Sequence, residues 1–219
     1  MDSYGRTTMK SHEQGVRARA RRHSAFATLR ASAVLAALVL GGAASAQDGE
    51  ALYATCIACH GADGAGNAAL GAPAIAGQLE SYLVRQLSNF RAGVRGAAEG
   101  DQYGAQMAPF ATQLADEAAV SAVAAYVAAL NPVASDDTTS GDTRKGASLY
   151  NGNCGACHGG SAEGNESLNA PRLAGLGSSY LKRQFANYAN GIRGSHADDR
   201  LGRQMAMMAK TLPDETALN

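Results

Sequence analysis

Cys56-Ile57-Ala58-Cys59-His60 and Cys154-Gly155-Ala156-Cys157-His158 are two copies of the pattern C-x-x-C-H, and they decide the fold of this chain. In each copy two thiols lie one helical turn apart and an imidazole follows directly. Such thiols can add to the two vinyl groups of a haem while the imidazole reaches the iron. The pattern therefore predicts two covalently bound haem c groups. The predicted attachment residues are Cys56, Cys59, Cys154 and Cys157, and the predicted histidine ligands are His60 and His158.

A single C-x-x-C-H is not specific to haem. It can arise by chance, or as a redox or zinc C-x-x-C pair followed by an unrelated histidine. Here the two motifs use all four cysteines of the chain. Two copies, no spare cysteine and an export leader favour haem over these alternatives.

Residues 1–46 have the features of a signal peptide. A basic stretch comes first, an apolar run over 31–43 follows, and Ala44-Ser45-Ala46 is a small-x-small cleavage site. We expect cleavage after Ala46 and a soluble mature chain in the periplasm. The alternative is an uncleaved anchor, but a membrane span needs about 20 apolar residues and this run is shorter.

The charge balance changes when the leader is removed. The whole chain has 19 basic and 19 acidic residues, and the part after residue 46 has 12 basic and 17 acidic residues, a net charge of −5. Nothing in this balance favours nucleic acid as a partner. An acidic carrier would be steered toward basic docking surfaces.

The composition leaves little to form a core. Much of the 46% hydrophobic content is alanine, tryptophan is absent, and aromatic residues make up 5%. Two lobes of about 80 residues each would hold few large side chains to bury. We expect a haem to complete the core of each lobe, and the polypeptide without haem to be largely unfolded.

An internal repeat accounts for most of the chain. A shift of 98 residues from Cys56 onward aligns the two copies without a gap. Such a repeat predicts two copies of one domain, at 47–131 and 145–219, joined by a polar, turn-rich linker at 132–144. The matched segments include Ala72-Pro73 with Ala170-Pro171, Tyr82-Leu83 with Tyr180-Leu181, Gln86 with Gln184, Arg95-Gly96 with Arg193-Gly194, and Gln106-Met107 with Gln204-Met205.

Each copy has helical patterning and no convincing alternating strand, so the predicted fold class is all-α. Short helices over 49–55 and 146–151 lead into the haem motifs. Residues 79–91 place apolar side chains three and four residues apart, which is typical of a helix packed on one face. In the first copy Asp116 can cap a helix over 117–130 that ends before Pro132.

The repeat also selects a candidate for the sixth iron ligand. Met107, Met205, Met207 and Met208 follow the haem motifs, but only Met107 and Met205 occupy equivalent positions. A soft thioether suits haem iron and raises its reduction potential, so we expect these two as axial ligands. Methionine is also a common core filler, and we assign that role to Met207 and Met208.

From about Gly49 to its end, the chain resembles the tandem diheme cytochromes c4. The motifs C-x-x-C-H, A-P-x-x-A-G, Y-L-x-x-Q and G-x-R-G and a distal methionine occur in that order in both halves. The resemblance implies two class I cytochrome c domains, with His60 and Met107 on one iron and His158 and Met205 on the other. It also implies that carbonyls of Pro73 and Pro171 accept hydrogen bonds from the two histidines.

The resemblance further implies a one-electron carrier of the respiratory chain and not an enzyme. Family members are periplasmic, soluble or loosely attached to the membrane surface, and deliver electrons to terminal oxidases. The donor would be a quinol-oxidising complex or a dehydrogenase. His/Met ligation closes both axial positions of each iron, which leaves no vacancy for a substrate.

The second copy departs from the pattern, because it ends before an equivalent of the helix over 117–130. We expect the second domain to lack its C-terminal helix through truncation of the sequence rather than as a natural variant. A small lobe can hardly spare so much of its core. The second haem should then be the less stable of the two.

Two other functions remain open. The chain could be the cytochrome subunit of a dehydrogenase, such as a sulfide-oxidising flavocytochrome, or a diheme peroxidase, which needs an open or displaceable axial site. The roles of the repeated arginines also remain open. Arg85, Arg95, Arg183 and Arg193 could pair with haem propionates or be exposed helix charges.

Overall fold

The computed structural model describes residues 48–134 and 141–212, all within one compact unit, Ser45–Asn219. The expected leader, its cleavage site after Ala46 and the expected end of the second domain lie outside these residues. So does the middle of the linker, 135–140. Among the described residues no helix is long and apolar enough to cross a membrane.

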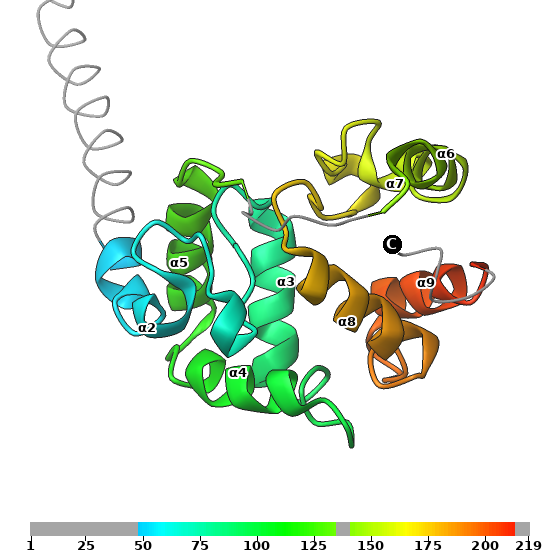
Figure 1. Ribbon diagram of the computed structural model, residues 1–219. Helices are drawn as coiled ribbons and strands as arrows, with labels where there is room; N and C mark the ends of the chain where they lie inside the picture. Colours follow the sequence, from blue (N-terminus) through cyan, green and yellow to red (C-terminus); the bar gives the residue numbers. More distant parts are fainter. Residues whose placement is uncertain (1–47, 135–140, 213–219) are drawn as a thin grey trace, which may run out of the picture. The chain divides into compact units, whose positions relative to one another are not determined.

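The first lobe begins with a helical stretch at 48–53, and four further α-helices and one 3-10 helix follow it (Figure 1). They are α2 (Ile57–His60), η1 (Ala68–Leu70), α3 (Glu80–Arg91), α4 (Gln102–Thr112) and α5 (Glu117–Ala129).

The second lobe repeats this order as far as it is described. Its elements are α6 (Thr143–Asn153), α7 (Gly155–His158), η2 (Glu166–Leu168), α8 (Ser178–Ala189) and α9 (Arg200–Ala209). In the described parts of both lobes β-structure is limited to two isolated bridges, one in each lobe. The all-α prediction is therefore confirmed.

The core of the first lobe lies where α3 packs against α5 and α4. Tyr53 and Leu83 contact a face of α5 that includes Val120, Val123 and Val127. Tyr53 is 1% exposed and Val120 is fully buried. The alanine-rich sequence thus concentrates its few larger side chains on the inner face of one helix.

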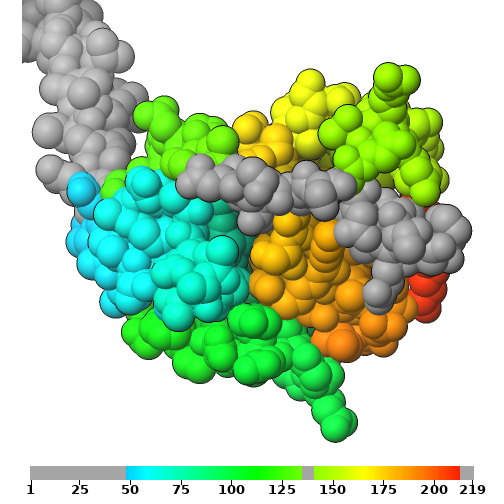
Figure 2. Space-filling model, viewed as in Figure 1, coloured from blue at the N-terminus to red at the C-terminus, as the bar shows by residue number. Residues whose placement is uncertain are grey.

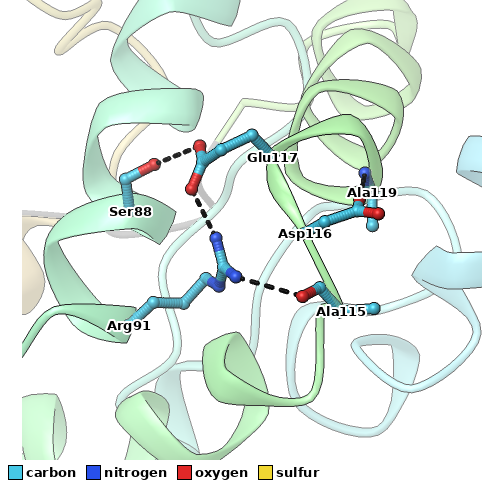
Figure 3. Close-up of polar contacts among 6 residues, drawn as sticks. All are labelled: Ser88, Arg91, Ala115, Asp116, Glu117 and Ala119. Carbon is cyan, nitrogen blue, oxygen red and sulfur yellow. Dashed lines mark hydrogen bonds and ion pairs between the residues drawn. The ribbon is translucent and has the colours of Figure 1, made fainter.

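The start of α5 is fixed by its own cap and by α3 (Figure 3). The Asp116 carboxylate accepts a hydrogen bond from the backbone N–H of Ala119 at 2.8 Å, as the sequence predicts. Arg91 of α3 forms an ion pair with Glu117 at 2.6 Å, and Ser88 donates to the other oxygen of the same carboxylate. These contacts set the position of the helix that covers the core.

The helices that carry the methionines, α4 and α9, begin in the same way in both lobes. The buried carboxylates of Asp101 and Asp199 accept hydrogen bonds from the backbone N–H groups of Gly104 and Gly202, at 3.0 and 2.8 Å. Gly96 approaches α4 so closely that a β-carbon there would lie 2.5 Å from the carbonyl oxygen of Gly104, and its φ of +84° also favours glycine. Gly96, the last glycine of G-x-R-G, therefore allows α4 to pack closely against the preceding turn.

The loop that leads into α4 is exposed. Residues 97–100 protrude from the surface in the space-filling view, where they are green (Figure 2).

Candidate functional site

Four predicted site residues of the first lobe meet at one cavity. Cys56, Cys59 and His60 line it from α2 and the turn before it, and Met107 lines it from α4. The remaining walls are mostly apolar. They include Leu70, Ile75, Leu83, Leu87, Phe90, Phe110, Val123 and Val127.

His60 is held by a main-chain carbonyl. Its side chain is buried, and its Nδ1 donates a hydrogen bond to the carbonyl oxygen of Pro73 at 2.9 Å. A carbonyl can only accept, so the proton is on Nδ1 and the lone pair of Nε2 is free to bind a metal. Burial lowers the pKa of His60, and the Pro73 carbonyl partly opposes that effect. The neutral ring is the form that can coordinate iron.

The second lobe has the same arrangement. His158 is buried, and its Nδ1 donates to the carbonyl oxygen of Pro171, also at 2.9 Å. Met205 lies half-buried on α9, at the position that Met107 has on α4.

A tyrosine ahead of each motif is a site residue that the sequence reasoning missed. The Tyr53 hydroxyl donates to the carbonyl oxygen of Gly61 at 2.8 Å, and the Tyr150 hydroxyl donates to that of Gly159 at 2.7 Å. Each bond ties the preceding helix to the residue directly after the histidine. Burial raises the pKa of Tyr53, so this hydroxyl keeps its proton. Leu-Tyr recurs ahead of both motifs in the sequence, which marks the two tyrosines but not the bonds that they make.

Met207 does not fill a core, so that expectation is wrong for Met207. Met207 is 64% exposed and Met208 is 42% exposed. Met208 occupies the position that Phe110 has in the first lobe, where Phe110 lines the cavity.

The cysteines have the wrong environment for redox thiols. Burial raises the pKa of the Cys56 and Cys154 thiols, whereas a redox-active thiol has a lowered pKa. A structural zinc site needs four ligands. Among the residues that the structure describes, no three His, Cys, Asp or Glu side chains could hold a metal ion together.

The four repeated arginines are not exposed helix charges, so that alternative is wrong. Arg193 is only 5% exposed and the other three are half-buried. Arg95 and Arg183 line the first cavity, and the Nε atom of each is buried without a hydrogen-bond partner. Unpaired cationic donors at the wall of an apolar cavity fit a large apolar group that carries carboxylates, as a haem does.

Comparisons with known proteins agree with this geometry. The sequence matches the family model for cytochrome c over residues 46–131 and again over 143–217. It is 32% identical to cytochrome c4 of Azotobacter vinelandii over 176 residues, which cover 75% of this chain and 81% of that protein. It is also 32% identical to the thiosulfate dehydrogenase electron acceptor of Stutzerimonas stutzeri, over 83% of this chain and 87% of that protein.

Solved structures give the same result. The fold is similar to reduced recombinant cytochrome c4 from Pseudomonas stutzeri, with a TM-score of 0.64 and 25% identity over 79% of this chain and 93% of that chain. It is similar to thiosulfate dehydrogenase from Marichromatium purpuratum, with a TM-score of 0.64 and 29% identity over 78% of this chain and 38% of that chain.

Proposed function

This chain belongs to the cytochrome c family and, within it, to the diheme cytochromes c4, and we propose that it carries single electrons between respiratory proteins in the periplasm. The haem iron supplies the chemistry, a one-electron cycle between the ferrous and ferric states. The observation that carries the proposal is the pair of C-x-x-C-H motifs whose histidines are both fixed through Nδ1 at 2.9 Å.

The two covalently bound haem c groups have matching sets of residues. In the first lobe Cys56 and Cys59 form the thioether bonds, and His60 and Met107 bind the iron. In the second lobe these roles fall to Cys157, His158 and Met205, together with Cys154. The meeting of the first set at one apolar cavity supports this assignment.

The protein's residues act on the cofactor in three ways. The Pro73 and Pro171 carbonyls fix the histidine rings and increase their basicity. The thioether ligands raise the reduction potentials, and the apolar walls keep water from the metal. Arg95 is half-buried at the cavity wall and would supply a guanidinium for a haem carboxylate of its own lobe.

The proposed acceptor is a terminal oxidase, and the proposed donor is a quinol-oxidising complex or a dehydrogenase. Over 82 residues the chain is 37% identical to FixP, a subunit of a cbb3-type cytochrome c oxidase in Sinorhizobium medicae. Another relative is named as the electron acceptor of a thiosulfate dehydrogenase. The net charge of −5 after residue 46 suits basic docking surfaces on these partners.

A second candidate is a cytochrome subunit that stays bound to a dehydrogenase, as in a sulfide-oxidising flavocytochrome. The likeness to part of a thiosulfate dehydrogenase chain favours it. Purification of the protein from its periplasm decides between the two. A carrier elutes alone, and a subunit elutes with a second polypeptide at constant stoichiometry.

Optical spectra test the proposal itself. We expect two low-spin haems in both oxidation states, and no change on addition of cyanide to the ferric form or carbon monoxide to the ferrous form. Binding of either ligand at one haem would reveal an open axial site and favour a diheme peroxidase.

A further inference from the structure

The second lobe contributes to the wall of the first lobe's cavity. Tyr180, Arg183 and Gln184, all on α8, line the cavity that contains Cys56, Cys59, His60 and Met107. The first site is therefore built from both lobes, and one of its two lining cations comes from the lobe that does not supply its ligands.

Arg183 is held in place by residues of that same cavity. Its Nη2 donates to the carbonyl oxygen of Gly71 at 2.6 Å, and its guanidinium lies 4.0 Å from the ring centroid of Tyr103. Gly71 and Tyr103 both line the cavity. The Nε atom of Arg183 is buried without a hydrogen-bond partner, so the guanidinium is fixed beside the cavity with one donor unpaired.

The matching arginine of the first lobe lies in a different environment. Arg85 donates to the carbonyl oxygen of Asn169 at 2.9 Å, which repeats the bond from Arg183 to Gly71 under the 98-residue shift. The residue that corresponds to Tyr103 is Leu201, which has no aromatic ring. Arg85 lies over Tyr82 of its own lobe at 5.3 Å, just as Arg183 lies over Tyr180 at 5.4 Å, so Arg85 lacks only the ring contact across the lobes. The contacts that Arg183 and Arg85 make with the opposite lobe are therefore unequal.

We propose that Arg183 sets the reduction potential of the haem in the first lobe, across the boundary between the lobes. A fixed positive charge disfavours the ferric state, which carries one more positive charge than the ferrous state, so it raises the potential. The walls of the cavity are mostly apolar, which strengthens the effect of a nearby charge. The inference rests on the proposed function, because it assumes a haem in the first cavity.

The experiment uses the full-length protein with Met205→His, which moves the second haem to low potential and leaves the first haem to be titrated alone. In that background, Arg183→Gln keeps a donor for the Gly71 carbonyl and removes the charge. We expect the equilibrium constant for reduction of the first haem to fall about tenfold. For one electron this corresponds to a reduction potential that is lower by about 59 mV. Arg183→Lys keeps the charge and should recover most of that loss.

A matched control removes a positive charge from the first lobe itself. Arg91 lies on α3 and pairs with Glu117 outside the cavity, so Arg91→Gln should shift the same potential much less than Arg183→Gln does. An unchanged potential in Arg183→Gln, or an equal loss in Arg183→Lys, would overturn the inference. Intact masses that show two haems on every variant would leave the proposed function standing in that case, whereas missing haem in the parent protein would remove the basis of both.

Discussion

At the scale of single residues, a proline carbonyl accepts a hydrogen bond from the haem-motif histidine in both lobes. It fixes the histidine ring through Nδ1 and leaves Nε2 for the metal. No side-chain substitution removes a main-chain carbonyl, so the bond is insensitive to most mutations at that position. Proline also restricts its own φ, which steadies the carbonyl that the histidine meets.

The methionine assignment makes a prediction for each lobe. Met107→His should lower one of the two reduction potentials and Met205→His the other, each by more than about 0.1 V, because imidazole stabilises ferric iron better than a thioether does. A redox titration followed by absorbance measures both. If either variant leaves both potentials unchanged, that methionine is not a ligand.

Tyr53 makes a prediction about stability. Tyr53→Phe removes the donor to the Gly61 carbonyl in a side chain that is 1% exposed, and should lower the free energy of unfolding by about 2 kcal/mol. Denaturant unfolding of the haem-loaded protein measures the loss. Tyr150→Phe is the matched control, and it should cost less because Tyr150 is only half-buried. Equal losses would show that burial does not determine the cost.

Some of the site residues could be predicted from the sequence alone, and others could not. The C-x-x-C-H pattern identifies the cysteines and histidines without any structure, because covalent haem attachment constrains that spacing. Choosing among the four methionines needs the internal repeat. The tyrosine bonds could not be derived from the sequence, because a hydroxyl bonded to a carbonyl eight or nine residues away depends on the path of the turn between them.

At the scale of elements, α5 was predicted well and α4 was not. The Asp116 cap and the extended Leu130 before Asn131-Pro132 mark the ends of α5 in the sequence. By contrast, α4 contains Gly104 and Pro109, which both weaken helix propensity, and its cap is a buried aspartate. That cap and the close approach of Gly96 stabilise a helix that local preference alone would not predict.

Packing of α5 on α3 makes a prediction at this scale. Val120 is fully buried and does not line the haem cavity, so Val120→Ala tests helix packing alone. It should lower the free energy of unfolding by about 2 kcal/mol, from lost burial and the small cavity left behind. Ser121→Ala, at the exposed next position, should change stability by less than about 0.5 kcal/mol. If the two variants behave alike, α5 is not held by this face.

At the scale of the whole molecule, glutamines join the two lobes. Gln86 accepts hydrogen bonds from Arg95 at 2.7 Å and Arg193 at 2.7 Å, one arginine from each lobe. Gln184 accepts from the same two arginines, at 3.3 Å from Arg95 and 2.6 Å from Arg193. The sequence reveals that these residues recur, but not that the copies exchange hydrogen bonds, because a repeat carries no information about how its copies dock.

This cluster predicts coupled stability. Gln184→Leu leaves the buried Arg193 and the half-buried Arg95 each short of an acceptor, and should lower the free energy of unfolding by about 3 kcal/mol. Gln184→Glu keeps the acceptor oxygens beside the two cations and should retain stability at neutral pH. Denaturant unfolding followed at the haem absorbance measures both variants. A loss in Gln184→Glu as large as in Gln184→Leu would show that the arginines do not need this acceptor.

Covalent attachment of two haem groups to each chain underlies every function proposed above, and the intact mass of the protein isolated from the periplasm tests it most directly. We expect a polypeptide mass increased by two haem groups, with that increase kept after denaturation because thioether bonds survive unfolding. A mass with no added haem, or with one, would contradict it.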